Sequence, residues 1–449
     1  MNVLVVDEDF AYPLNTGKKL RTYNLLSRLQ EKHLIHYVYH DCPEQGGMRE
    51  LPGCPNVICH PVEKKLTEKR GVKFYGELLW NLLSPKPYLV SRHTSAPMVQ
   101  KIADILHHNS IDLIHCEWTP YTENILGLLG KYPCVLSTHN VESQIWQRYF
   151  ETEENLLKKA YIYFQWIKMA NYERSVAPLY GKVVCVSEND AEFFRAYTQP
   201  ENVTVVPNGV DETYFAPADS PRGSSGSPSG NHSAPASGSV SDSAPDGSLG
   251  SMIGSMPGRT FVQTVDSEAA SASLVFTGSM DWRPNQDAVS HFVDAVFPLI
   301  RAKRPDVTFY VVGRHPPERL KAQWEQTPGV VVTGIVDDVR GYIHDAAVYV
   351  VPLRIGGGSR LKILEALAME KVVISTRVGA EGLHFDDGVH LLLRDSPEAF
   401  ATAVLQVLQS PEAYTPLAQQ GRRWLLDNYT WDSISNILNT VWHDAAARP

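Results

Sequence analysis

Residues 348–383 read VYVVPLRIGGGSRLKILEALAMEKVVISTRVGAEGL, and three patterns within them decide the fold. The apolar run at 348–351 is typical of a strand buried on both faces, and the run at 372–375 repeats it. Between the two runs, apolar residues from Leu361 to Met369 recur at helical spacing, which predicts a helix. A strand, a glycine-rich loop, a helix and another strand thus follow one another, as they do in α/β proteins.

The loop before this helix has the composition of an anion-binding site. It consists of Gly356, Gly357, Gly358 and Ser359. Glycines let the backbone approach a ligand without a Cβ in the way, and the free N–H groups and dipole of a helix N-terminus favour a phosphate. Arg360 and Lys362 add positive charge to the first turn, where helices usually carry acids. A glycine-rich turn is also often only a tight connection, so this pattern alone leaves both interpretations open.

The same alternation of strands and helices occurs in both halves of the chain. At 449 residues the chain exceeds the size at which one hydrophobic core stops growing, so two domains are expected. Short apolar runs of the buried-strand kind occur at 3–6, 35–39, 113–116, 134–137, 183–186 and 203–206, and again at 274–277, 308–312, 330–332, 348–351 and 372–375. The predicted fold class is therefore α/β, with two doubly wound domains.

The two halves are separated by a segment that cannot form a core of its own. Residues 216–265 are dominated by Ser, Gly, Pro and Ala, and large apolar residues are rare among them. Such a composition buries too little apolar surface to offset the entropy of ordering the chain. The sequence predicts a first domain at 1–215, a flexible insertion at 216–265 and a second domain at 266–425.

Composition excludes several classes of function. A hydrophobic content of 43% and a charged content of 20% are ordinary for a soluble protein, and a net charge of −9 argues against a general nucleic-acid binder. The N-terminus lacks the charged and apolar regions of a signal peptide, and no apolar run is long enough to span a bilayer. The six cysteines show no Cys-x-x-Cys spacing, so reduced thiols and a cytoplasmic location are expected.

Ligands of doubly wound sheets bind beyond the carboxyl ends of the strands, so the residues after each strand are the candidates for function. Gly17 precedes a predicted helix after the first strand. The polar cluster His139, Asn140 and Glu142 follows the run at 134–137. His139 is a candidate for contact with a substrate, although a lone histidine at a strand end is more often structural.

Several fragments together carry a resemblance to a known family. They are THNVE, VCVSENDAEFF, VPNGVDETYF, FTGSMDWRPNQDAV, VVGRHPP, VTGIVDDV and PLRIGGGSRLKILEALA, together with the glycine loop near Gly17. In this order and spacing the chain resembles the GT-B glycosyltransferases of family 4, over nearly its whole length apart from the insertion. The resemblance implies two Rossmann-like domains facing a cleft, an acceptor-side domain at 1–215 and a nucleotide-sugar donor domain at 266–425, with a last helix at 426–449 that returns to the first domain.

The resemblance also implies roles for particular residues. Glu365 matches the second glutamate of the family's E-x7-E pattern, which usually holds the ribose hydroxyls of a sugar nucleotide. The first glutamate would fall at Gly357, so selection of the donor sugar must use other groups. Gly278 matches the position after the first strand of the donor domain. Val336 lies in the turn that resembles the part of the family packed against the nucleobase.

The reaction that the resemblance implies is the retaining transfer of a sugar from a nucleotide-sugar donor to a hydroxyl acceptor, as in polysaccharide biosynthesis. Arg360 and Lys362 would stabilise the leaving diphosphate without an obligatory metal, since fixed cations can replace one. His139 would lie across the cleft, near the donor sugar and the acceptor hydroxyl. No cofactor is expected, and the acceptor would be a glycan or a lipid-linked glycan.

Two further questions stay open at the level of sequence. The segment 64–83 places lysines and an arginine beside apolar and aromatic residues, and it favours peripheral contact with an anionic membrane, although such helices often cover a core instead. A soluble acceptor is the alternative.

Two other functions compete with sugar transfer. One is a catalytically silent nucleotide-sugar binding protein, which Gly357 suggests, and the other is a sugar-nucleotide epimerase of the same fold.

Overall fold

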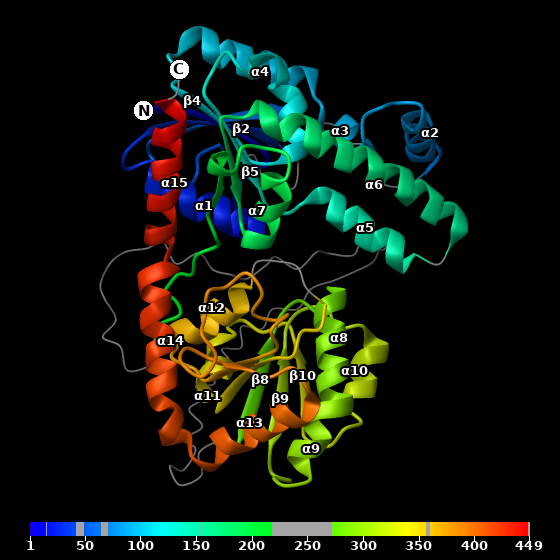
Figure 1. Cartoon of the computed structure of the whole chain (residues 1–449), viewed down its shortest axis with the longest axis vertical. Coiled ribbons are helices and arrows are strands. Elements are labelled where there is room, and N and C mark those ends of the chain that lie inside the picture. The colour runs from blue at the N-terminus through cyan, green and yellow to red at the C-terminus, as the bar shows by residue number, and fades with distance from the viewer. Residues whose placement is uncertain are drawn as a thin grey trace, which may run out of the picture.

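The structure is a computed structural model that describes residues 1–14, 16–41, 49–63, 71–153, 155–217, 272–355 and 360–447. The predicted insertion lies almost entirely outside the described residues, as does the glycine loop at 356–359. Figure 1 shows two α/β units, one above the other, with a pair of helices running along one side of both.

The strands of the first unit form a parallel sheet in the order β3-β2-β1-β4-β5-β6-β7. Their bounds are β1 (Asn2–Asp9), β2 (Leu34–Asp41), β3 (Val57–Glu63), β4 (Leu113–Cys116), β5 (Cys134–Thr138), β6 (Lys182–Cys185) and β7 (Val203–Val205). The helices of this unit are α1 (Gly17–Leu29), α2 (Gly71–Leu82), α3 (Tyr88–His93), α4 (Ala96–His108), α5 (Glu142–Thr152), α6 (Leu156–Val176) and α7 (Glu188–Arg195).

The second unit repeats this topology with the strand order β10-β9-β8-β11-β12-β13. Its strands are β8 (Ser273–Thr277), β9 (Thr308–Val312), β10 (Val330–Gly334), β11 (Val348–Val351), β12 (Val373–Ser375) and β13 (Leu392–Leu393). Its helices are α8 (Arg283–His291), α9 (Phe297–Arg301), α10 (Glu318–Trp324), α11 (Arg340–Asp345), α12 (Leu361–Ala368), α13 (Pro397–Gln409) and α14 (Thr415–Asn428).

The predicted α/β class is confirmed, and each predicted strand is present, with bounds that differ from the predicted ones by at most three residues. Strands β1, β4, β8 and β11 are fully buried in their centres, as continuous apolar runs require. Two strands were missed: β3, because His60 and Pro61 interrupt its apolar pattern, and β13, because it is only two residues long. Strand β3 lies at the edge of the sheet, where a proline is tolerated.

The last helix, α15 (Trp431–Ala446), leaves the second unit and packs on the first (Figure 1). Its buried residues share one helical face and join the core beneath α1: Trp431, Ile434, Leu438, Val441, Trp442 and Ala445. The preceding helix α14 packs on α12 in the second unit. The C-terminal segment therefore ties the two units together along one side.

In both sheets the strand order reverses between the first and fourth strands of the unit. This switch point lies between β1 and β4 in the first sheet and between β8 and β11 in the second. Crevices open beyond the carboxyl ends of the strands at such points, and ligands of this fold class bind there. The topology thus directs attention to the residues that follow these four strands.

Candidate active site

A cavity of about 440 Å³ lies at the switch point of the second sheet. Its described lining comes mostly from the second unit, with Gly17 at the start of α1 contributed by the first. The polar and charged lining residues include Asn285, Arg360, Lys362 and Glu365, and Gly278 follows strand β8 at its edge. This volume lies in the range of small-molecule sites.

Lys362 places a cation in the wall of this cavity. It belongs to the first turn of α12, and its Nζ donates a hydrogen bond to Asn285 Oδ1 at 2.8 Å. The same ammonium lies 4.0 Å from the centre of the Phe276 ring, a cation–π distance. Burial lowers the pKa of Lys362 to about 7, against the opposing effect of Glu365. Lys362 forms no ion pair within the described part of the chain, so an incoming anion would increase its charge.

Glu365 lies one helical turn further along α12 and also lines the cavity. Burial raises the pKa of its carboxyl to about 7, although the nearby Lys362 acts in the opposite direction. In the regions that the structure describes, its carboxylate accepts no hydrogen bond. A carboxylate can accept from two hydroxyl groups at once, so this side chain is suited to a vicinal diol such as a ribose.

Arg360 is the N-cap of α12 and adopts a left-handed conformation with φ of 50°. Positive φ is uncommon for residues other than glycine, and such strain often marks functional positions. The guanidinium donates from Nη2 to Glu381 Oε2 at 3.1 Å, and Glu381 Oε1 accepts from Asn189 Nδ2 of the first unit at 2.7 Å. Arg360 therefore lines the cavity and also takes part in a bridge between the two units.

Gly278 is needed for close packing at this site. A Cβ built on Gly278 would lie 2.8 Å from Asn285 Nδ2 and 3.0 Å from Lys362 Nζ. The absence of a side chain therefore gives Asn285 and Lys362 the room to meet. Gly313 supports the same turn from β9, since its Cβ would come within 1.7 Å of the Gly278 carbonyl oxygen.

His139 lies at the carboxyl end of β5 in the first unit, and its side chain is 12% exposed. Its Nε2 lies 3.2 Å from Glu117 Oε2, and Glu117 directly follows strand β4. Burial would raise the pKa of Glu117, but its contacts with His115 and His139 lower it well below the usual range. A buried carboxylate thus lies next to Nε2 of the predicted catalytic histidine.

The two other residues predicted on this side lie close to His139 in sequence. Asn140 is half-buried and forms no hydrogen bond within the described ranges. Glu142 is buried at the start of α5, and its Oε1 accepts from Trp118 Nε1 at 2.8 Å. Burial raises the pKa of Glu142 to about 7. The carboxyl of Glu142 therefore titrates near neutral pH.

The acidic triplet after β1 is neutralised by lysines of α1. Lys18 Nζ lies 2.6 Å from Asp7 and 3.1 Å from Glu8, and Lys19 Nζ lies 3.2 Å from Asp9. These ion pairs fix the start of α1, where Gly17 meets the cavity. The lysines beside Gly17 are therefore paired internally.

The structure brings together only part of the predicted set. Gly17, Gly278, Arg360, Lys362 and Glu365 share the cavity. The cluster of His139, Asn140 and Glu142, and also Val336, are absent from its described lining, and Val336 packs against the core of the second unit. Gly356, Gly357, Gly358 and Ser359 lie outside the described residues.

Sequence reasoning missed Asn285 and Glu117. Glu117 directly follows a predicted strand, so the rule that selected His139 applied equally to it. Asn285 is in the fragment FTGSMDWRPNQDAV, but a single asparagine inside a helix gives no local signal of its role.

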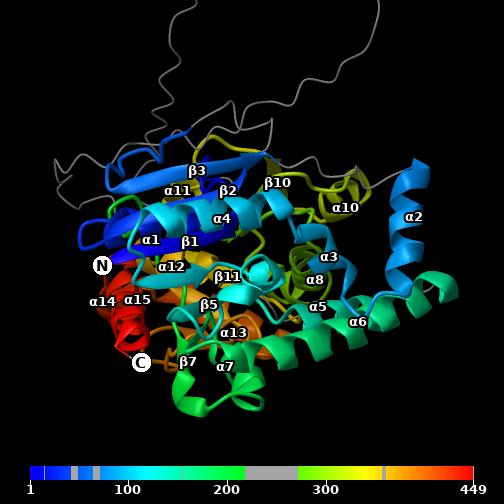
Figure 2. The same ribbon diagram turned by 90° about the horizontal axis from the view of Figure 1, so that it is seen from above.

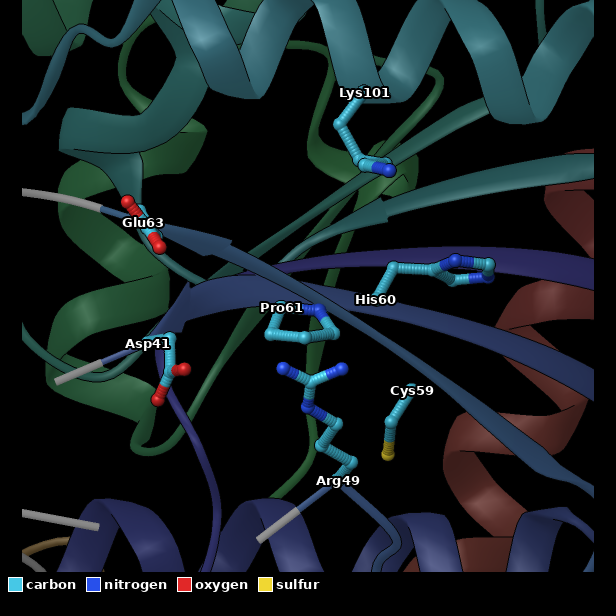
Figure 3. Close-up of a pocket in the computed structure, with 7 residues that line it drawn as sticks. All are labelled: Asp41, Arg49, Cys59, His60, Pro61, Glu63 and Lys101. Atoms are coloured by element: carbon cyan, nitrogen blue, oxygen red, sulfur yellow. The ribbon is translucent and has the colours of Figure 1, made fainter. Parts of the chain in front are cut away.

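A second cavity, of about 380 Å³, lies at the edge of the first sheet (Figure 3). Lys101 extends into it from α4, and Arg49, Asp41 and Glu63 also line it. The positive and negative charges balance, which favours neither an anion nor a cation. None of the residues predicted for function lies there, so the cavity between the units is the stronger candidate.

Two family models match the chain in succession. The model described as Glycosyltransferase Family 4 matches residues 20–214, and the model described as Glycosyl transferases group 1 matches residues 271–410. The first match covers most of the first unit, and the second covers the sheet and most helices of the second unit.

Curated relatives match over shorter stretches. The chain is 32% identical over 129 residues to the GDP-mannose:cellobiosyl-diphosphopolyprenol alpha-mannosyltransferase of Xanthomonas campestris, which covers 28% of this chain and 29% of that protein. It is 22% identical over 166 residues to an uncharacterized 44.6 kDa protein in the cps region of Klebsiella pneumoniae, covering 35% and 43%. The chain thus spans less than half the length of either curated relative.

Solved structures match over the whole chain. Sucrose-phosphate synthase from Thermosynechococcus elongatus aligns with a TM-score of 0.64 and 14% identity, covering 99% of this chain and 98% of that one. An Anabaena protein crystallised with UDP and glucose aligns with a TM-score of 0.58 and 13% identity, covering 98% of each chain. At such identities the likeness establishes a shared fold.

Proposed function

Because the chain belongs to the GT-B glycosyltransferases of family 4, we propose that it transfers a sugar from a nucleotide-sugar donor to a hydroxyl acceptor, with retention of the anomeric configuration. The observation that carries this proposal is the pairing of Lys362 and Glu365 on one face of α12. The ammonium suits a diphosphate, and the carboxylate without a hydrogen-bond partner in the described structure suits the adjacent ribose.

The chemistry follows from where charge develops. The bond between the anomeric carbon and the diphosphate oxygen breaks, and the acceptor oxygen bonds to that carbon on the face from which the nucleotide leaves. The acceptor proton passes to the leaving phosphate oxygen. Lys362 stabilises the charge that grows on the diphosphate, and Arg360 adds a second positive charge at the N-terminus of α12. Neither contribution requires a metal ion.

The first unit supplies the other side of the reaction centre. His139 is a group that can contact the donor sugar and the acceptor hydroxyl, and Asn140 and Glu142 lie beside it in sequence. The acceptor is a glycan or a lipid-linked glycan. Support for a nucleotide-sugar donor comes from the Anabaena structure, which contains UDP and glucose, and from the Xanthomonas relative, whose name specifies GDP-mannose.

The proposal is tested with a panel of UDP-, GDP- and ADP-sugars. One class is expected to raise the melting temperature, because a ligand at 100 times its Kd stabilises the folded state by about 2.7 kcal/mol. Nucleotide release should then depend on an added glycan or lipid extract. Stabilisation without release would identify a silent binding protein, and isomerisation of the donor without acceptor would identify an epimerase. No stabilisation by any nucleotide sugar would overturn the donor site.

We further propose peripheral contact with an anionic membrane through helices α2 and α6. Within the ranges that the structure describes, no helix combines the length and apolar content needed to cross a bilayer. Figures 1 and 2 both show α5 and α6 projecting away from the first sheet, with α2 beside the outer part of α6. Residues 64–70 of the predicted contact segment lie outside the described residues.

Large apolar side chains are exposed on the projecting helices α2 and α6. Leu156 and Leu157, at the start of α6, are 81% and 86% exposed, and Trp80 at the end of α2 is 77% exposed. The contact of α2 with α6 is fixed by Lys168 Nζ, which donates to the Asn81 carbonyl oxygen at 2.7 Å. Lys158 follows the two leucines directly, so an anionic headgroup layer would satisfy both the apolar and the charged parts of this surface.

Replacing both Leu156 and Leu157 with serine is expected to weaken binding to phosphatidylglycerol-containing vesicles by about 100-fold. Losing the burial of two leucines costs about 3 kcal/mol or more, which corresponds to that factor. The measurement is vesicle co-sedimentation. Leu299→Ser, at a 40% exposed position on α9, is the matched control and should bind as the wild type does. Equal binding by the double variant would place any membrane contact elsewhere.

A further inference from the structure

A buried series of side chains connects the C-terminal helix to His139. Trp442 of α15 donates from Nε1 to His115 Nδ1 at 3.0 Å, although the two residues are 327 positions apart in the chain. His115 Nε2 lies 3.0 Å from Glu117 Oε1. Glu117 Oε2 lies 3.2 Å from His139 Nε2. All members except His139 are at most 2% exposed.

The first contact fixes the direction of the others. An indole N–H can only donate, so His115 Nδ1 must be the acceptor and carries no proton. The proton of the neutral His115 ring is then on Nε2, from which it donates to Glu117. The tautomer of His115 is thereby set from α15.

Glu117 has one oxygen left after this bond, and that oxygen faces His139. Neither Glu117 Oε2 nor His139 Nε2 has another hydrogen-bond partner among the described residues. A buried carboxylate needs donors around it, since the cost of removing its charge from water is otherwise not recovered. His139 is the side chain placed to provide the second donor.

We propose that Glu117 is a positioning residue that holds His139 as the Nε2–H tautomer, with Nδ1 available to the reactants, and that Trp442 of α15 completes this arrangement through His115. The tautomer itself is a property of the folded chain, whereas its effect on the reaction rests on the proposed sugar transfer. The role of α15 thus extends beyond packing, because this helix supplies the first donor of the series.

In this arrangement the ionised carboxylate of Glu117 accepts from both histidines, one on each oxygen. A glutamine at 117 would change this. Its single oxygen would stay with His115 Nε2–H, and its NH₂ group would face His139, which would then accept at Nε2 and carry its proton on Nδ1.

The kinetic test is a double-mutant cycle of Glu117→Gln and His139→Ala. Glu117→Gln is expected to lower kcat by about 10- to 100-fold, the range seen when the carboxylate that orients a metal-bound histidine is removed, with a smaller change in KM. In the His139→Ala background the same change should have almost no further effect. Equal losses in both backgrounds would show that Glu117 acts independently of His139, and would overturn the proposal.

A spectroscopic test is independent of any sugar donor. Nitrogen-15 NMR of the histidines, with the His139 signals identified by their loss in His139→Ala, should show the Nε2–H tautomer in the wild type and Nδ1–H in Glu117→Gln. An unchanged tautomer in Glu117→Gln would overturn the proposal even if transfer occurs. A wild type that transfers no sugar but shows this tautomer shift would contradict the proposed function alone.

The contribution of α15 is tested without altering Glu117. Trp442→Phe keeps an aromatic ring in the core but removes the N–H donor, and is expected to lower kcat less than Glu117→Gln does. Trp431→Phe changes another buried indole of α15 that takes part in none of the polar contacts of this series, and should retain wild-type kcat. Equal kcat for Trp442→Phe and Trp431→Phe would remove α15 from the proposal.

Discussion

Replacing Lys362 with methionine is expected to lower sugar transfer by about 10²- to 10³-fold, which is the usual cost of removing one preorganised group that stabilises transition-state charge. Methionine keeps most of the buried stem of the side chain and removes the cation. The loss should fall mainly on kcat, because charge on the diphosphate grows as the bond to the sugar breaks. Initial-rate kinetics with the stabilising donor measure this.

The same variant should also change the number of protons that are taken up when the donor binds. Because the pKa of Lys362 is about 7, most of its side chains are neutral at pH 8 in the free protein. A bound diphosphate raises that pKa, so donor binding at pH 8 should take up close to one proton and affinity should fall as pH rises above 7. Calorimetry in buffers of different ionisation enthalpy measures the uptake, which Lys362→Met should abolish.

Lys303→Met is the control, since Lys303 is exposed on the second unit outside the cavity. It should retain both rate and proton uptake. If Lys362→Met transfers sugar at the wild-type rate, other groups must stabilise the diphosphate, and Arg360 would be the next candidate. Arg360 is already engaged by Glu381, so its replacement would also disturb the bridge to Asn189.

Replacing Glu365 with glutamine should weaken donor binding by about 10- to 100-fold, because hydrogen bonds to a charged group contribute about 1.5–3 kcal/mol. At pH 6 the free carboxyl is mostly protonated, since its pKa is about 7. Ribose hydroxyls donate to the ionised form and lower that pKa, so donor binding at pH 6 should release a proton. Titration calorimetry at pH 6 gives both the affinity and the proton count.

The comparison that isolates the ribose is a donor with a 2′-deoxyribose. Wild type should bind it more weakly than the parent donor, whereas Glu365→Gln should discriminate less between the two. If wild type and Glu365→Gln both bind the 2′-deoxy donor more weakly by the same factor, Glu365 does not contact the 2′-hydroxyl. Proton release at pH 6 that persists in Glu365→Gln would point to another carboxyl.

The strands, the two-unit organisation and the cavity helix were determined by the sequence itself. Strands such as 348–351 are buried on both faces, so each appears as a continuous apolar run that needs no partner to be recognised. Helix α12 follows from the spacing of its apolar residues, and Lys362 and Glu365 lie on one side of it because residues three apart share a helical face. These are properties of neighbours in the chain.

The tertiary structure alone decided which distant residues meet. Arg360 looks like a free cation in the sequence, but the loop after β12 gives it Glu381 as a partner, and Glu381 in turn accepts from Asn189 of the first unit. His139 and Glu117 follow separate strands, and their meeting depends on β4 and β5 being adjacent in the sheet. Trp442 reaches His115 only because α15 returns to the first unit. A local sequence pattern reveals which residues are buried and whether their spacing is that of a helix or a strand. Contacts between residues far apart in the chain depend on the topology, so these partners could not be predicted from the sequence.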